Sequence, residues 1–185
     1  MKLDECIKKR CSVRRFKTKR PDWKDIIKAI EASSKAPLAG NIPTIKFILV
    51  DNKEKIAELA EAAMQDFIYY ANYVVVVCSD KKQCIKSYGE RAERYCKQQA
   101  GAAIENFLLK ITELKLATCW VGAFADENVK RILQIPDEID VEALLPIGFP
   151  IANPKQRTKP SLDSCVYFNT WKNRYMKPII KPEAH

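Results

Sequence analysis

Histidine is almost absent from this 185-residue sequence, because the one residue of this type is His185 at its end. A Ser-His-Asp or Cys-His nucleophile system therefore has no base inside the fold, and imidazole-based zinc sites are excluded for the same reason. The 5 glycines form neither a dinucleotide fingerprint nor a P-loop. An enzyme with this inventory would take its reactivity from a cofactor. A phosphate on that cofactor would be held by cationic side chains and helix N-termini.

Membrane and export signals are also missing. No apolar run approaches the roughly 20 residues that a membrane span needs, and the first five residues lack the positive-then-apolar layout of a signal peptide. The 7 cysteines include no C-x-x-C pair, and Cys78, Cys84 and Cys96 match no ferredoxin spacing. We therefore expect a cytoplasmic protein without membrane contact, whose cysteines are mostly small buried hydrophobes.

Positive charge is concentrated at the two ends of the chain. The net charge is +9, of which residues 1–20 carry +7 and residues 155–185 carry +5, while the rest of the chain is net −3. A nucleic-acid-binding protein more often spreads its cations along one continuous face. We expect no nucleic-acid partner, although a basic binding module stays open as the less favoured alternative.

Hydrophobic periodicity predicts alternating helices and strands. Helices are expected at 2–10, 21–35, 52–65, 88–116 and 126–135. Strands are expected at 45–50, 73–79, 118–124 and 142–150, with 164–171 either a last strand or an extended arm. This alternation predicts one three-layer domain over 1–185, of the α+β or α/β class.

Four blocks of the chain resemble the FMN-dependent nitroreductase family. They are RCSVRRF (10–16), similar to R-x-S-x-R-x-F; APLAGN (36–41), similar to S-P-S-A-x-N; QAGAAIENFLLKITELKLATCWVGAF (99–124), which follows the long helix and its T-C-W-x-G-x-F exit; and LLPIGFPIANPKQRTKPSLDSCVYFNTW (144–171), similar to a P-x-G-Y-P strand with a basic loop beyond it. The blocks keep the family's order. The resemblance implies a three-layer α/β/α version of the α+β class, with a mixed, mainly antiparallel sheet.

The resemblance also implies a set of cofactor-binding residues. Near the N-terminus, the FMN phosphate, ribityl chain or pyrimidine edge would meet Arg10, Cys11, Ser12 and Arg14. The residues approaching the flavin from a partner subunit would be Pro37, Leu38, Ala39 and Asn41. Those beside the isoalloxazine, with backbone N–H groups facing it, would be Trp120, Val121, Gly122 and Ala123. The phosphate clamp would be completed by one of Lys155, Arg157 and Lys159.

These residue types suit the chemistry that the family performs. Arginine binds phosphate in a bidentate geometry, and a positive environment stabilises the charge that develops on a flavin as it is reduced. The resemblance thus implies a homodimer with flavin at the subunit interface and an exchanged C-terminal arm, about 161–185. Its expected activity is ping-pong electron transfer from NADH or NADPH, through FMN, to a small acceptor such as a nitroaromatic or quinone. Reductive dehalogenation or flavin fragmentation on the same fold is the alternative. No protein residue is expected to act as nucleophile or base.

Overall fold

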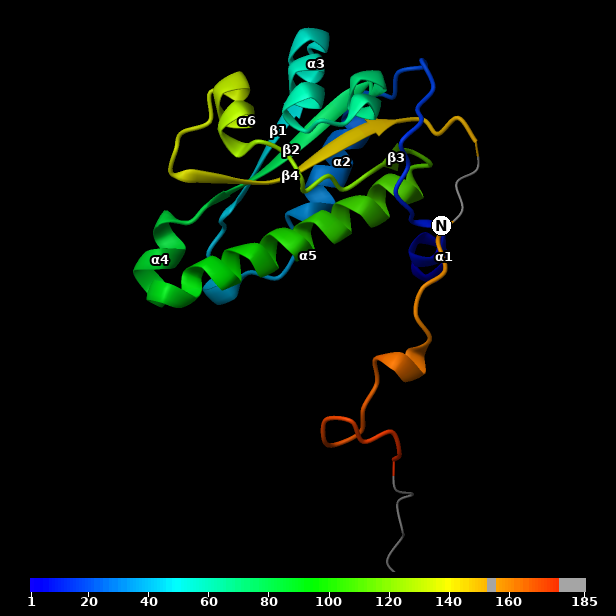
Figure 1. Ribbon diagram of the computed structural model, residues 1–185, viewed down its shortest axis with the longest axis vertical. Helices are drawn as coiled ribbons and strands as arrows, with labels where there is room; N and C mark the ends of the chain where they lie inside the picture. The colour runs from blue at the N-terminus through cyan, green and yellow to red at the C-terminus, as the bar shows by residue number, and fades with distance from the viewer. Residues whose placement is uncertain (153–155, 177–185) are drawn as a thin grey trace, which may run out of the picture.

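A four-stranded sheet forms the centre of the molecule (Figure 1). The computed structural model describes residues 1–152 and 156–176, and within these every strand pairing is antiparallel, in the order β1-β2-β4-β3. The strands are β1 (Ile45–Val50), β2 (Tyr73–Asp80), β3 (Ala117–Thr118) and β4 (Ile139–Gly148). The central strands β2 and β4 are buried on both faces along most of their length, which explains why 73–78 and 143–147 read as nearly continuous apolar runs.

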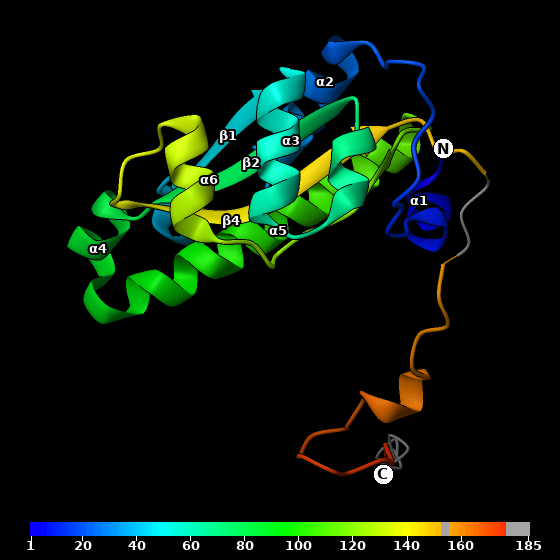
Figure 2. The same cartoon turned by 45° about the horizontal axis from the view of Figure 1, so that its top comes forward.

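Helices cover both faces of this sheet. The helices are α1 (Leu3–Lys9), α2 (Trp23–Ser33), α3 (Lys53–Ala62), α4 (Lys82–Tyr88), α5 (Ala92–Glu113) and α6 (Asp126–Leu133). Successive side chains of a strand point to opposite faces, so Val75 and Val77 pack in the cluster with α2 and α5, whereas Val74 and Val76 pack with α3 and α6. Figure 2 shows α3 and α6 on one side of the sheet and α5 on the other. The predicted three-layer α+β fold is confirmed.

Local capping explains where two of the helices begin. The Asp22 side chain accepts a hydrogen bond from the Lys24 N–H at 2.9 Å, and α2 starts between them. The Asn52 side chain accepts one from the Lys55 N–H at 2.9 Å at the start of α3. Each bond satisfies a backbone donor that the first turn of a helix leaves unpaired.

Helix α4 was not predicted from the sequence. Its one buried side chain is Cys84, so the segment has no apolar stripe of helical period. Gly89, with φ of +52°, ends α4 after Tyr88, and α5 therefore begins at Ala92 rather than at residue 88.

Two strands differ in their bounds from the prediction: β3 is shorter than the expected segment 118–124, and β4 begins earlier than the expected residue 142. Strand β3 ends at Thr118, and the chain rejoins the sheet only at Val121, which bridges to Leu144. Strand β4 begins at Ile139, three residues earlier than expected, because its polar start pairs with the end of β2 across an irregularity between Val77 and Cys78.

Beyond the sheet, the C-terminal segment runs away from the body beside α1 (Figures 1 and 2). It holds one 3₁₀ turn, η4 (Leu162–Ser164), and of the two alternatives predicted for 164–171, a last strand or an extended arm, the structure has the arm, with bends and turns. Within the described residues no helix is long and apolar enough to span a bilayer.

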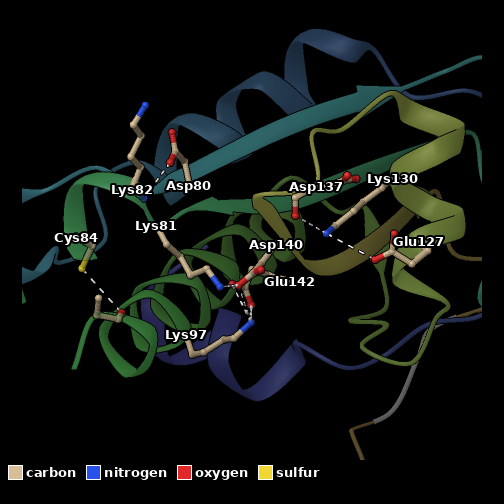
Figure 3. A network of polar contacts seen from close by, with 11 residues as sticks. Asp80, Lys81, Lys82, Cys84, Lys97, Glu127, Lys130, Asp137, Asp140 and Glu142 are labelled. Atoms are coloured by element: carbon tan, nitrogen blue, oxygen red, sulfur yellow. Dashed lines mark hydrogen bonds and ion pairs between the residues drawn. The ribbon is translucent and has the colours of Figure 1, made fainter. Parts of the chain in front are cut away.

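An ion-pair cluster ties α4 and α5 to the start of β4 (Figure 3). The Lys81 Nζ lies 2.8 Å from an Asp140 carboxylate oxygen, and the Lys97 Nζ lies 3.5 Å from the same oxygen and 3.2 Å from Glu142. Burial opposes ionisation of Asp140, but the two lysines outweigh it, and its pKa lies below the ordinary value. The charged form of Asp140 is therefore favoured by folding.

Acid should weaken this attachment. A carboxylate with a depressed pKa in the folded state contributes stability above its ordinary pKa of about 4, and that contribution is lost as the pH falls through the folded value. Between about pH 6 and pH 3, the wild type should lose roughly 0.5–1 kcal/mol more unfolding free energy than Asp140→Asn, the scale of a partly exposed pair. Urea unfolding of both proteins at each pH measures this difference. Equal pH dependence would contradict it.

Candidate functional site

The basic N-terminal segment, residues 10–17, lies along the edge of the sheet beside β3. The Val13 N–H donates to the Thr118 carbonyl at 2.9 Å, and the Lys17 N–H donates to the Phe149 carbonyl at 2.8 Å. These bonds fix an otherwise exposed, highly charged stretch in an extended form. The segment is therefore part of the fold rather than a loose tail.

A pocket of about 520 Å³ opens between this segment, the end of α5 and the chain around β3. Its volume falls in the range of small-molecule and cofactor sites. Four of the site residues predicted from the sequence line this pocket, namely Arg10, Cys11, Ser12 and Trp120. Lys9 and Lys115 add two further cations, and none of the lining residues is acidic. The pocket therefore suits an anionic ligand.

Arg10 is held in place from two sides. Its side chain is 19% exposed, and its Nε lies 3.6 Å from a Glu105 carboxylate oxygen on α5. The Gln156 side-chain amide donates to the Arg10 carbonyl at 2.9 Å. Through Gln156 the second basic segment reaches the first, which brings Arg157 into the neighbourhood of the pocket. Arg157 and Lys159 are exposed; Lys155 lies outside the described residues.

Arg14 points to the other side of the N-terminal segment. Its guanidinium lies 5.6 Å from the centre of the Phe67 ring. Phe67 belongs to the 3₁₀ turn η2 (Asp66–Tyr70), which packs with the α3 side of the sheet. Arg14 is outside the pocket lining, so the predicted arginines face two different surroundings rather than one clamp.

In the segment after β3, the backbone N–H of Val121 is bonded within the sheet, whereas the backbone of Gly122 and Ala123 is exposed. The Val121 side chain is 3% exposed, and its N–H donates to the Leu144 carbonyl at 3.0 Å, so that N–H is occupied within the sheet. Gly122 and Ala123 are exposed, and in the described part of the chain no backbone carbonyl accepts from their N–H groups. A Cβ on Gly122 would meet only the Trp120 indole nitrogen, at 3.9 Å. The backbone at Gly122 is thus open to a flat group.

The loop with Pro37, Leu38, Ala39 and Asn41 lies at the opposite end of the sheet. The carbonyl of Thr44, just after this loop, accepts a hydrogen bond from the Asp80 N–H at 2.8 Å. Asp80 is the residue of β2 that pairs with Ile139 at the start of β4. The pocket lies where β3 pairs with Gly148 at the end of β4. Eight residue steps from Asp140 to Gly148 span about 26 Å at 3.3 Å per residue. One chain therefore does not bring the two predicted groups of site residues together.

One residue of the pocket lining carries a buried polar atom without a partner. Thr118 is 5% exposed, lines the pocket, and its hydroxyl has no hydrogen-bond partner among the described residues. An unpaired buried hydroxyl is costly unless something completes it. Burial raises the pKa of the Cys11 thiol, and the nearby Arg10 opposes this rise. Cys11 therefore stays a neutral thiol at neutral pH.

Several pocket residues were not predicted from the sequence as site residues. They are Lys9, Thr112, Lys115 and Thr118 in the pocket lining, together with Gln156, which bonds to the backbone of the lining residue Arg10. Two of them had a local signal, because Lys9 adjoins Arg10 and Thr118 is the first residue of the T-C-W-x-G-x-F motif; the other three come together through the fold. The spacing of Thr112, Lys115 and Gln156 along the chain matches no motif among the four blocks.

The fold and this site define a three-layer α+β protein with a cationic pocket at the sheet edge. The Nitroreductase family model matches residues 7–71 and 63–149. The chain belongs to the nitroreductase family, and is therefore an oxidoreductase, which confirms the resemblance seen in the four sequence blocks.

Three comparisons illustrate the relationship. The chain is 30% identical over 156 residues to a protein of Archaeoglobus fulgidus provisionally named NADH dehydrogenase/NAD(P)H nitroreductase, covering 80% of this chain and 87% of that protein. It is 24% identical over 185 residues to an iodotyrosine deiodinase of Thermotoga neapolitana, covering 91% and 98%. A solved FMN-dependent nitroreductase of Clostridium difficile R20291 is 26% identical, with a TM-score of 0.77 and coverage of 90% and 98%.

Proposed function

We propose that this protein is an FMN-dependent oxidoreductase that takes electrons from NADH or NADPH and passes them to a small acceptor such as a nitroaromatic or a quinone. The observation that carries the proposal is the cationic pocket at the sheet edge, lined by Arg10, Ser12 and Thr118 and adjoining the open backbone of Gly122. A pocket lined by cations and hydroxyl groups, followed in the chain by exposed N–H groups, matches a phosphorylated, planar cofactor. The solved relative described as FMN-dependent supports the choice of FMN.

The residues of the pocket would bind and orient the cofactor. The Arg10 guanidinium and the hydroxyls of Ser12 and Thr118 would donate to its phosphate and ribityl oxygens. The cations of Lys9 and Lys115 would raise the positive potential there. Arg157 or Lys159, and Lys155 from the undescribed stretch, would complete the phosphate contacts.

The remaining residues would tune the flavin ring. Arg14, on the other side of the segment, would stabilise negative charge at the pyrimidine edge. The N–H groups of Gly122 and Ala123 would donate to ring acceptors, and the half-exposed Trp120 would shield that edge from water. FMN, when bound, would supply hydride acceptance from the nicotinamide and electron transfer to the second substrate in a ping-pong cycle.

We also propose that the working unit is a homodimer. The loop 37–41 lies too far from the pocket of its own chain to touch the same cofactor, so a second copy would supply it. The C-terminal arm carries large side chains that a single chain leaves in water, with Leu162 73%, Trp171 78% and Tyr175 83% exposed. Covering such residues against a neighbour would be favourable.

The visible absorbance spectrum tests the cofactor assignment. The purified protein, or the apoprotein mixed with FMN, should show flavin bands and elute as a dimer. Under anaerobic conditions NADH or NADPH should bleach these bands, and a nitroaromatic should restore them. A colourless dimer or monomer that binds no added FMN would overturn the proposal.

Cys11 offers an independent test of where the cofactor binds. Cys11 lines the pocket and is partly exposed, whereas Cys165 is exposed on the arm. Saturating FMN should slow alkylation of Cys11 by about 10-fold or more, because a bound ligand excludes the reagent in proportion to occupancy. Alkylation of Cys165 serves as the internal control and should slow less. Peptide mass spectrometry after timed labelling gives both rates, and equal protection would contradict the assignment.

Reductive dehalogenation is the second candidate, because one relative is an iodotyrosine deiodinase that matches almost the whole chain. In that reaction two electrons and one proton replace a carbon–halogen bond by carbon–hydrogen and release halide. A panel of nitroaromatics, quinones and halogenated phenols, run with the same reductant, separates the two. Halide release faster than nitro or quinone reduction would favour the second candidate.

A further inference from the structure

Tyr88, at the end of α4, lies directly against the loop 37–41. Gly40 in this loop has a φ of +56°, and an added Cβ there would overlap the Tyr88 hydroxyl and lie 3.2 Å from the ring carbon that bears it. The three heavy atoms nearest to that Cβ position all belong to Tyr88. Position 40 therefore favours glycine for two reasons: its backbone is in the left-handed region, and Tyr88 leaves no space for a Cβ.

The loop exposes Gly40 and Asn41 to solvent. Its 3₁₀ turn, η1 (Ala39–Asn41), contains two consecutive left-handed residues, because Asn41 has a φ of +57°. Such residues keep their conformation only where the surroundings hold it. The backbone bonds within the turn are those from the Asn41 and Ile42 N–H groups, at 3.2 and 3.1 Å.

Tyr88 itself is firmly placed. Its ring packs edge-to-face on Tyr95 of α5, with centroids 5.0 Å apart and planes at 88°. It joins a small cluster with Ile42 and the fully buried Cys84 and Cys96. The other end of α4 is tied to β4 by the Lys81–Asp140 ion pair (Figure 3). A chain of contacts thus runs from the sheet through α4 to Gly40.

We infer that Tyr88 is a positioning residue for the cofactor: it holds the loop 37–41 in the form that meets the flavin of the partner subunit. This inference rests on the proposed function, in which that loop completes the FMN site of a second copy. Tyr88 does not touch the reacting atoms; it acts through Gly40.

A rescue experiment tests this role. Gly40→Ala should weaken FMN binding to the apoprotein by about 10-fold, the equivalent of roughly 1.4 kcal/mol of strain in the loop. Removing the overlapping hydroxyl in Gly40→Ala/Tyr88→Phe should recover part of this loss, to within about 3-fold of wild type, because effects of touching residues are not additive. Flavin fluorescence quenching measures the dissociation constants, and far-UV circular dichroism checks folding.

Tyr95→Phe is the matched control. Tyr95 lies in the same cluster, and this substitution also removes one tyrosine hydroxyl. None of the three atoms nearest to the Cβ position of Gly40 belongs to Tyr95. Gly40→Ala/Tyr95→Phe should therefore bind FMN no better than Gly40→Ala alone. Equal rescue by both double variants, or rescue by neither, would overturn the role of Tyr88.

Hydrogen exchange of the loop amides gives a readout that needs no cofactor. In the apoprotein, Tyr88→Ala should speed exchange at Asn41 and Ile42 by about 10-fold, since the loop loses its support. Faster exchange without any change in FMN affinity would leave the proposed function standing and refute the positioning role. Failure of the wild type to bind FMN would instead refute the proposed function, and this inference with it.

Discussion

Replacing Arg10 and Arg14 together by alanine should yield a folded protein that retains no FMN. The two side chains lie on either side of the N-terminal segment, Arg10 in the pocket and Arg14 beside Phe67. Hydrogen bonds to a charged partner contribute about 1.5–3 kcal/mol each, so losing both should weaken binding by about 10²-fold or more. Neither side chain belongs to the hydrophobic core, and the fold should lose no more than about 1 kcal/mol.

The ratio of flavin to protein absorbance after purification measures this loss, followed by titration of the apoprotein with FMN. Arg15→Ala/Lys17→Ala is the matched control, because it removes the same charge from exposed positions of the same segment. That control should keep its flavin. Undiminished flavin in the Arg10/Arg14 variant would contradict the assignment of these residues to the FMN site. Equal loss of flavin in both variants would show that only the net positive charge of the segment matters.

Gly148→Ala should have the second largest effect, on both stability and cofactor binding. A Cβ at Gly148 would lie 2.9 Å from the Asn72 side-chain oxygen, 2.9 Å from the Phe16 Cβ and 3.0 Å from a Phe16 ring carbon. The Phe16 Cβ is bonded to the backbone, and Phe16 bridges to Pro150, so it moves only with the N-terminal segment. Overpacking of this kind costs about 1–3 kcal/mol.

The same shift should disturb Arg10 and Ser12, which belong to that segment. We therefore expect FMN affinity to fall by about 10-fold together with the unfolding free energy. Thermal melts of the apoprotein and FMN titrations measure the two effects. Gly101→Ala is the comparison, since its Cβ would meet nothing within 4 Å and alanine is the better helix former by roughly 0.5–1 kcal/mol. A Gly148→Ala protein as stable as wild type would show that the N-terminal segment yields without cost.

Local sequence signals predicted those elements whose own residues carry an apolar run or a helix cap. The run of apolar residues in β2 indicated a central strand, and the caps Asp22 and Asn52 mark where α2 and α3 begin. Helix α4 escaped prediction because it buries only Cys84. Its position depends on contacts with distant partners, such as Lys81 with Asp140 on β4, which no local pattern contains.

The candidate site divides in the same way. The sequence indicated Arg10, Ser12 and Trp120 through motifs with fixed spacing, and it indicated two basic ends. Thr118 belongs to one of these motifs, but its unpaired buried hydroxyl became evident only in the structure. The sequence did not indicate Gln156, whose side-chain amide reaches a carbonyl 146 residues away.

By itself, then, the sequence determined the chemistry that is available: no histidine base, no phosphate-binding glycine loop, and cations gathered at two ends. It also determined the family, because the four blocks and their order along the chain can be recognised in the sequence alone. Only the tertiary structure decided which of these cations share a pocket, and that the loop 37–41 lies at the opposite end of the sheet from it. The physical reason is that side chains meet through packing across the sheet, where distance in space has little relation to distance along the chain.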